Sequence, residues 1–221
     1  MNKLRPVALL CSGPISRSPL TRLPVFRRNL AWVKSSSYRV ASRAVNALGA
    51  GSAVTEVSEM KRAGIWVISV PSSELIASLE ELQTAGLDWR NQILLIFDTE
   101  AESDKAAWFQ DNGAFAATFT PIDSEESRYI VEGDSEAVRV LRTLVEDPRS
   151  RRVIEIKKGA KATYLAGALA ATKCVLPYIA EALESFQAAG VGNLEAKAIT
   201  ESLLAGAMRS YFRAGRRAIK S

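Results

Sequence analysis

The sequence contains no histidine. This absence excludes Ser-His-Asp and Cys-His catalytic groups, and it excludes metal sites that depend on imidazole. Acid–base chemistry would therefore fall to lysine, tyrosine, aspartate, glutamate or a thiol. The only cysteines, Cys11 and Cys174, are too few for a disulfide scaffold or a usual zinc site. We predict no bound metal, and two reduced thiols in a cytoplasmic protein.

Acidic residues are missing from the first 55 positions, which hold nine Lys or Arg before the first acid, Glu56. Residues 56–147 carry 7 basic and 19 acidic side chains, whereas residues 148–221 carry 13 basic and 5 acidic ones. The basic N-terminal segment favours a phosphate-bearing ligand. It also has the composition of an organellar transit peptide, but the strand expected at 7–11 favours a folded role. Nucleic-acid binding is the weaker interpretation, because no aromatic recognition pattern accompanies the basic residues.

A long uninterrupted hydrophobic run is also missing. The most apolar stretch, 164–183, contains Lys173, Pro177 and Glu181, so we predict a buried helix and no membrane span. The 221 residues are 48% hydrophobic and 24% charged, a composition typical of globular proteins with a core. That length suits one large domain or two small ones.

Short apolar segments alternate with longer helical patterns over the first half of the chain. Strands are expected at 7–11, 31–34, 53–57, 64–71 and 92–97, and helices at 19–30, 38–48, 74–85 and 101–112. Strands that are apolar throughout are typical of parallel sheets covered on both faces. The pattern therefore predicts an α/β fold with a doubly wound, mostly parallel sheet. Ser72 or Ser73 would cap the third helix, and the acids at 98–104 are interpreted as a solvated helix start.

The rhythm changes after Gly113. Strands are expected at 114–119, 128–131 and 152–157, with a helix at 135–146, and the Ala-rich remainder predicts helices at 160–189 and 194–214. We therefore predict a domain at 1–157 and a small all-helical domain at 158–221. About 60 residues bury too small a core to stand alone. The small residues of these helices suit close packing, so we predict a homodimer formed through them.

The turn after the first strand keeps one of the three glycines of a dinucleotide-binding loop. Gly13 stands where the pyrophosphate approaches the backbone, while Cys11 and Ser16 replace the other two glycines. Pro14 also removes one backbone N–H that a phosphate could use. We predict that the pyrophosphate lies against Ser12, Gly13, Pro14, Ile15 and Ser16, with Ser18-Pro19 starting the next helix. The alternative is an ordinary strand-to-helix turn.

The end of the second strand carries no acid for a ribose 2′-hydroxyl. Its polar and basic residues would instead suit the 2′-phosphate of NADP, and they are Lys34, Ser35, Ser36 and Arg39. If a dinucleotide binds, NADP is therefore favoured over NAD. The alternative is a polar loop that caps the following helix.

Three later segments complete a family pattern: Ser69-Val-Pro71, Phe119-Thr-Pro121, and Ala162-Thr-Tyr-Leu-Ala166 with Thr172-Lys173. With the glycine turn, they resemble the Rossmann-like proteins of unknown function that carry an appended helical domain. These lie in the 6-phosphogluconate dehydrogenase-like superfamily, near pyrroline-carboxylate reductase and deazaflavin-dependent NADP reductase. The resemblance implies that Val70 and Pro71 lie beside a bound dinucleotide. This chain departs from the family in three places. Phe119-Thr-Pro121 stands where the family has a His-Pro turn but lacks the histidine, Leu165 replaces a histidine, and Lys173 replaces an asparagine.

The last helices hold the candidate catalytic residues. Lys161, Tyr164 and Thr172 are spaced to share one helical face, and Lys173 adjoins it. A lysine or tyrosine beside a nicotinamide could protonate the alkoxide formed by hydride transfer. We therefore take Lys161, Tyr164 and Lys173 as catalytic candidates. In the alternative, Tyr164 packs in the core and the lysines reach solvent or pair with acids.

These features lead to two functional hypotheses. The first is an NADP-dependent oxidoreductase that acts on a small carbonyl, imine or hydroxy-acid substrate between its domains. The second is a non-catalytic homodimer that keeps the fold but has lost cofactor binding or turnover.

Overall fold

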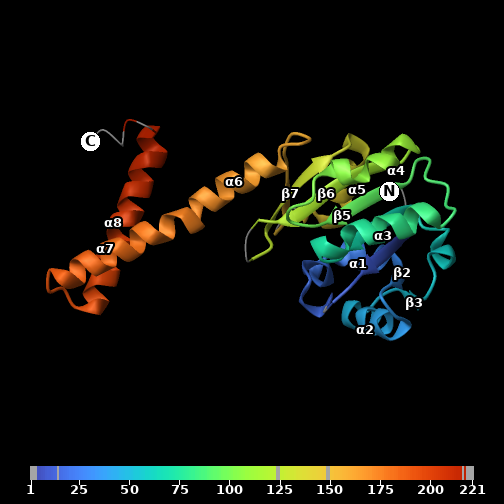
Figure 1. The fold of residues 1–221 in the computed structure, drawn as a ribbon, viewed down its shortest axis with the longest axis horizontal. Helices are drawn as coiled ribbons and strands as arrows, with labels where there is room; N and C mark the ends of the chain where they lie inside the picture. Colours follow the sequence, from blue (N-terminus) through green and yellow to red (C-terminus); the bar gives the residue numbers. More distant parts are fainter. Residues whose placement is uncertain (1–3, 14, 123–124, 148–149, 216, 218–221) are drawn as a thin grey trace. The chain divides into compact units, whose positions relative to one another are not determined.

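The computed structural model describes residues 4–13, 15–122, 125–147, 150–215 and 217 (Figure 1). The chain divides into two compact units, Met1–Thr163 and Tyr164–Ser221. The boundary predicted near residue 158 falls in the loop that precedes helix α6, six residues before this division.

An eight-stranded sheet forms the centre of the first unit, in the order β3-β2-β1-β4-β5-β6-β7-β8. Neighbouring strands are parallel except β6 and β7, which are antiparallel. The strands are β1 Val7–Cys11, β2 Leu30–Lys34, β3 Ser52–Val54, β4 Ile65–Ser69, β5 Ile93–Phe97, β6 Phe115–Pro121, β7 Arg128–Gly133 and β8 Arg152–Glu155. The predicted doubly wound, mostly parallel α/β fold is confirmed.

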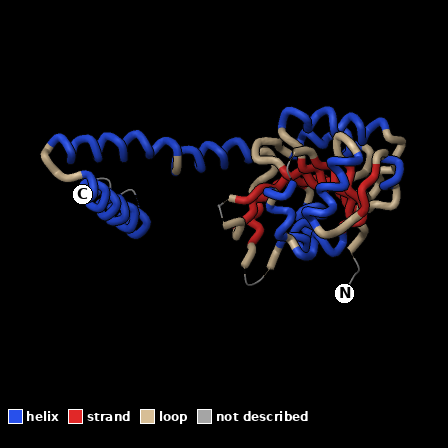
Figure 2. Tube along the Cα trace, turned by 90° about the horizontal axis from the view of Figure 1, so that it is seen from below, coloured by secondary structure: helices blue, strands red, loops and turns tan. Residues whose placement is uncertain are grey.

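Helices cover both faces of this sheet, as Figure 2 shows for the red strands between blue helices. One face packs against α1 Pro24–Asn29, α2 Tyr38–Leu48 and α5 Ser135–Val145, and the other against η3 Val57–Met60, α3 Ser72–Thr84, η4 Ser103–Ala106 and α4 Ala107–Asp111. Strand β1 is buried throughout, because Leu9 faces the first layer and Leu10 the second. This explains why its sequence is apolar without alternation.

The segment after β1 differs from the single helix predicted at 19–30. It forms η1 Ile15–Arg17, then η2 Pro19–Arg22, and only then α1. Pro19 and Pro24 each lack a backbone N–H, so a continuous helical hydrogen-bond ladder cannot pass through them. Ser18 does cap η2 as predicted, and its side chain accepts a hydrogen bond from the Leu20 N–H at 3.4 Å.

Helix α3 corrects a second prediction. Ser72 is its first residue and Pro71 precedes it without a side-chain cap, so neither Ser72 nor Ser73 caps the helix. The Ser72 hydroxyl instead donates to the Asp98 carboxylate at 2.7 Å. That carboxylate also accepts from the N–H groups of Glu100 and Ala101, and the tight turn delays the helix expected at 101–112.

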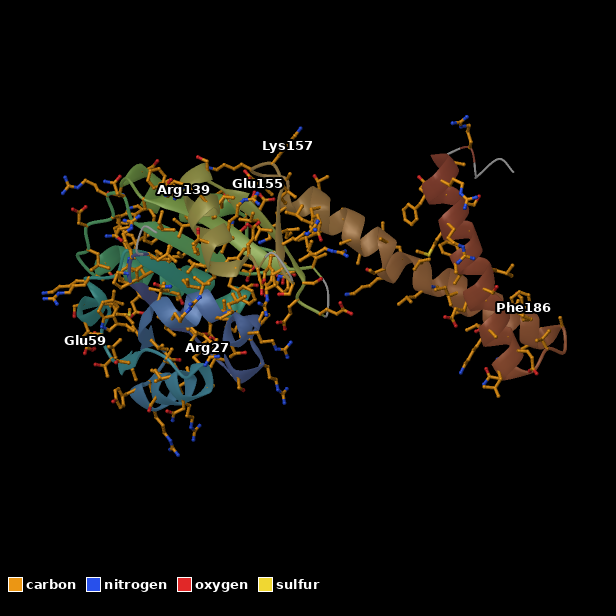
Figure 3. All side chains as sticks on the ribbon, turned by 180° about the vertical axis from the view of Figure 1, so that it is seen from behind. Arg27, Glu59, Arg139, Glu155, Lys157 and Phe186 are labelled. Carbon is orange, nitrogen blue, oxygen red and sulfur yellow. The ribbon has the colours of Figure 1, made fainter. Side chains whose placement is uncertain are left out.

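The second unit consists of helices: α6 Lys161–Ala171, whose first residues still belong to the first unit, η5 Lys173–Val175, α7 Leu176–Ala188 and α8 Asn193–Ala214. Pro177 explains why the predicted helix at 160–189 is interrupted, since a proline ring clashes with the carbonyl four residues earlier. Helices α7 and α8 contact each other. Figure 3 shows their side chains, including the half-buried Phe186 of α7.

Among the described residues of the second unit, only Ala196 and Thr200 are buried. The buried helix predicted at 164–183 is therefore not buried within this unit. By length and composition alone, the helical stretch Lys161–Ala188 also qualifies as a membrane span, with none of its most apolar window buried.

Candidate functional site

The carboxyl ends of β1, β4, β5 and β6 border a cavity of about 560 Å³, here called cavity A. Strand order reverses beside β1, whose neighbours are β2 and β4. In open α/β sheets, ligands bind at this kind of switch point. Cavity A is lined by Ser12, Gly13, Ile15, Ser18, Pro19, Ser69, Val70, Pro71, Ser72, Phe97, Asp98, Thr99, Glu100, Thr120 and Pro121.

Gly13 lies between cavity A and a second cavity of about 450 Å³, cavity B. Its φ is +73°, and among the described residues no heavy atom outside its chain neighbours stands within 4 Å of the position that a Cβ would take. Only glycine adopts this backbone conformation freely. The backbone at the predicted pyrophosphate position is therefore open on its side-chain face, as close approach of an anion requires.

The Ser12 hydroxyl is buried and has no hydrogen-bond partner among the described residues. A buried hydroxyl without a partner is costly, and because Ser12 borders cavity A, rotation of its side chain toward the cavity would let the hydroxyl meet a ligand oxygen. The neighbouring residues contribute less: Ile15 is buried with its N–H donating to the Gly13 carbonyl, and Pro14 lies outside the described residues. Ser16 is exposed and borders cavity B.

The helix N-terminus expected to attract the pyrophosphate is not present. Gly13 leads into the three-residue η1, and α1 has only six residues. A helix this short contributes little dipole to the turn. Anion binding here would depend on hydroxyl groups and on the positive charge bordering cavity B.

That charge is Arg43 of α2, which borders cavity B together with Ser16 and Ser36. Arg43 makes no salt bridge within the part of the chain that the structure describes. Sequence reasoning chose Arg39, which is exposed and borders none of the cavities described here. Arg39 and Arg43 are four residues apart in α2, so they lie on the same side of the helix. This i, i+4 spacing was the signal that could have identified Arg43.

Two other residues predicted to bind the 2′-phosphate already have partners within the protein. Lys34 forms a 2.6 Å ion pair with Glu81 of α3, and the Ser35 hydroxyl donates to the Cys11 carbonyl at 2.5 Å. Both border a third cavity of about 110 Å³, cavity C, as do Ser36 and Val70. Burial raises the pKa of Cys11 to about 11, although the Ser35 hydroxyl opposes this, so the thiol at the first-glycine position is neutral.

The resemblance implies that Val70 and Pro71 lie beside a bound dinucleotide, and this stays a prediction. Both border cavity A, and Val70 also borders cavity C. The Ser12 N–H donates to the carbonyl of Ser69 at 3.3 Å, which joins the glycine turn to the end of β4.

Asp98 corrects the interpretation of residues 98–104 as fully solvated. It is 9% exposed and borders cavity A. Burial alone would raise its pKa, but hydrogen bonds from the Ala101 N–H, the Ser72 hydroxyl and the Glu100 N–H hold the pKa below its ordinary value, with the charge of Lys161 adding to them. Asp98 is therefore a carboxylate at neutral pH.

Lys161 has surroundings unlike those expected for a proton donor to substrate. It is 1% exposed, and its ammonium donates to the carbonyls of Asp98 and Ala101 at 2.6 Å and to the Thr118 hydroxyl at 3.2 Å. Burial lowers its pKa to about 8, against the opposing charges of Asp98, Glu132 and Glu102. Lys161 borders none of the three cavities, and these hydrogen bonds anchor the start of α6 in the first unit.

Glu132 completes this buried network from β7. It is 1% exposed and accepts hydrogen bonds from the N–H groups of Ser103 and Gly159, the latter at 2.7 Å. The other two catalytic candidates belong to the second unit: Tyr164 is half-buried and Lys173 is exposed in η5. Their catalytic roles stay predictions. Within the described residues, no group of three or more Asp, Glu or Cys is placed to hold a metal ion.

Residues 127–219 match a domain of unknown function, DUF2520. Curated protein sequences give no match.

Solved structures match over nearly the whole chain. An imine reductase variant from Myxococcus stipitatus in complex with NAD+ is 16% identical, with a TM-score of 0.71 over 97% of this chain and 78% of that one. An imine reductase from the same organism in complex with NADP+ is 16% identical, with a TM-score of 0.65 over 96% and 78%. A pyrroline-5-carboxylate reductase from Coxiella burnetii is 11% identical, with a TM-score of 0.61 over 98% and 83%. These similarities confirm the Rossmann-like fold that the resemblance implied.

Proposed function

We propose that this Rossmann-like chain binds a nicotinamide dinucleotide across the carboxyl end of its sheet and is an oxidoreductase. The observation that carries the proposal is the open backbone at Gly13 beside the unpartnered, buried Ser12 hydroxyl. After rotation of the Ser12 side chain toward cavity A, a pyrophosphate oxygen would satisfy that hydroxyl, which no described residue does. In the two-halved Rossmann arrangement, adenosine would lie over β1–β3 and nicotinamide over β4–β6.

The residues that border the cavities fit such a cofactor. Ser12, Gly13 and Ser16 would hold the pyrophosphate, while Val70 and Pro71 would lie along the dinucleotide. Ser36 and Arg43, with Arg39 nearby on α2, would receive a 2′-phosphate, which supports a preference for NADP. When bound, the cofactor supplies the hydride.

The nicotinamide half would lie in cavity A, whose volume suits the ring and a small substrate. The hydroxyl groups of Thr99 and Thr120 stand 3.3 Å apart in it, and Asp98 and Glu100 give it negative charge. We propose a small carbonyl, imine or hydroxy-acid substrate, with Tyr164 and Lys173 as candidates for the proton transfer. Imine reductases and a pyrroline-5-carboxylate reductase among the similar structures support this class.

We also propose that the protein is a homodimer joined through the second unit. The part of this unit that the structure describes exposes nine large apolar side chains: Leu169, Leu176, Tyr178, Leu194, Ile199, Leu203, Met208, Tyr211 and Phe212. A second copy would cover surface that a monomer leaves in water.

The test of the oxidoreductase proposal is NADPH oxidation by the full-length protein against a panel of small cyclic imines, aldehydes and 2-keto acids. We expect turnover with at least one class, reduced about 100-fold or more in Tyr164→Phe if the phenol donates the proton. NADPH binding without turnover on any member would contradict the oxidoreductase proposal and support the non-catalytic alternative.

A further inference from the structure

The Lys34–Glu81 ion pair occupies the place where Rossmann proteins discriminate between NAD and NADP. Lys34 is the last residue of β2, and an acid near this point would bind the ribose 2′-hydroxyl, whereas a cation would bind a 2′-phosphate. This chain has a cation there in its sequence. In the structure, however, its Nζ lies 2.6 Å from a carboxylate oxygen of Glu81 on α3.

This ion pair is partly buried, because the lysine side chain is mostly shielded from solvent. The Lys34 side chain is only 12% exposed, while the Glu81 side chain is 44% exposed. Both border cavity C, and so does a second carboxylate, Glu74. The walls of cavity C therefore carry one positive and two negative side chains, which is an unfavourable setting for a phosphate dianion.

Ser36 connects cavity C to the more favourable surroundings of Arg43, because it borders both cavity C and cavity B. A phosphate near Ser36 would meet attraction from Arg43 on one side and repulsion from Glu81 on the other. The ammonium of Lys34, 2.6 Å from a Glu81 carboxylate oxygen, would offer such a phosphate a charge that Glu81 already partly neutralises.

We propose that Glu81 is a specificity-determining residue that weakens 2′-phosphate binding by holding Lys34 in an ion pair. The carboxylate that is missing at the end of the second strand is thus supplied by Glu81 of α3. The ion pair reduces the ratio by which the protein would favour NADP over NAD. The inference rests on the proposed dinucleotide site and adds a residue that the glycine-turn and second-strand motifs do not contain.

The experiment measures binding of 2′,5′-ADP and 5′-ADP by calorimetry, at one low ionic strength, to the full-length wild type, Glu81→Gln and Glu80→Gln. Glu80 is the matched control, since it is exposed on the same helix and borders none of the three cavities. We expect Glu81→Gln to bind 2′,5′-ADP about tenfold more tightly while 5′-ADP affinity changes less than about twofold. Glu80→Gln should match the wild type with both probes.

A double variant separates release of Lys34 from general loss of negative charge. In K34M/E81Q the gain for 2′,5′-ADP should disappear, whereas a gain that persists would mean that Lys34 is not the responsible group. Equal 2′,5′-ADP affinity in the wild type and Glu81→Gln, with 5′-ADP binding intact, would overturn this proposal alone. Failure of both probes to bind any variant would overturn the dinucleotide site itself. Melting temperatures within about 2 °C of the wild type would show that folding is unchanged.

Discussion

The Lys161 ammonium donates hydrogen bonds to buried backbone carbonyl oxygens that receive none from the backbone of the described residues around them. The carbonyls of Asp98 and Ala101 accept from it, and no other donor to them is seen within the described chain. Removing one member of a buried charged network leaves the other members unpaired, which costs more than the network itself contributes. Lys161 is therefore expected to stabilise the folded protein.

Replacement of Lys161 by methionine should destabilise the protein by about 3 kcal/mol, because two buried carbonyls and Glu132 would lose their charged neighbour. The measurement is urea unfolding followed by circular dichroism. Lys157→Met is the control, since Lys157 is exposed and should change stability by less than about 0.5 kcal/mol. Equal unfolding midpoints for the two variants would contradict the assigned role.

The same lysine should give stability a pH dependence. Its pKa is lowered from 10.5 to about 8 in the folded protein, so the unfolded chain binds more protons between these values. The free energy of unfolding contributed by Lys161 therefore rises from pH 8 toward pH 10.5 and is lowest below pH 8. Unfolding of the wild type and Lys161→Met across this range should show their difference growing with pH, and a constant difference would refute the lowered pKa.

At the scale of elements, the apolar strands and amphipathic helices were predictable from sequence because their patterns are local. Helix α2 was predicted with its observed bounds, and Gly49 ends it in a left-handed conformation. The burial of Lys161 was not predictable, because two of its three acceptors are backbone carbonyls 63 and 60 residues away in sequence and the third, the Thr118 hydroxyl, is 43 residues away. The pairing of Lys34 with Glu81 was hidden for the same reason: nothing near Lys34 in sequence carries an acid.

The antiparallel junction between β6 and β7 depends on glycine. Gly133 has φ +143°, and a Cβ there would stand 2.3 Å from the Ala116 carbonyl oxygen. Gly133→Ala should therefore destabilise the protein by about 3 kcal/mol or more, through strain and backbone overlap. Thermal unfolding is the measurement. Gly167→Ala in α6, where a Cβ meets nothing within 4 Å, should instead be neutral or slightly stabilising. Similar melting temperatures for the two variants would count against this role of Gly133.

At the scale of the whole molecule, the second unit leaves apolar surface exposed to water in a single chain. Its helices bury two residues among those described and leave nine large apolar side chains exposed. Light scattering of the full-length protein should give the mass of a dimer. Leu203→Glu should shift it toward the monomer, because a charge would enter the apolar interface, while Lys197→Glu serves as an exposed control. A monomeric wild type would contradict the proposed dimer.

The proposal of a dinucleotide site depends on the open backbone at Gly13, and titration with NADPH tests it most directly. Binding to the wild type should be measurable by fluorescence, and Gly13→Val should weaken it at least about tenfold, because side-chain atoms would fill the space for the pyrophosphate. Gly86→Val controls for backbone strain, since Gly86 also has a positive φ, of +66°, and borders none of the three cavities. The account predicts that only Gly13→Val loses affinity. Unchanged fluorescence of NADPH with the wild type, or equal affinity in Gly13→Val, would contradict it.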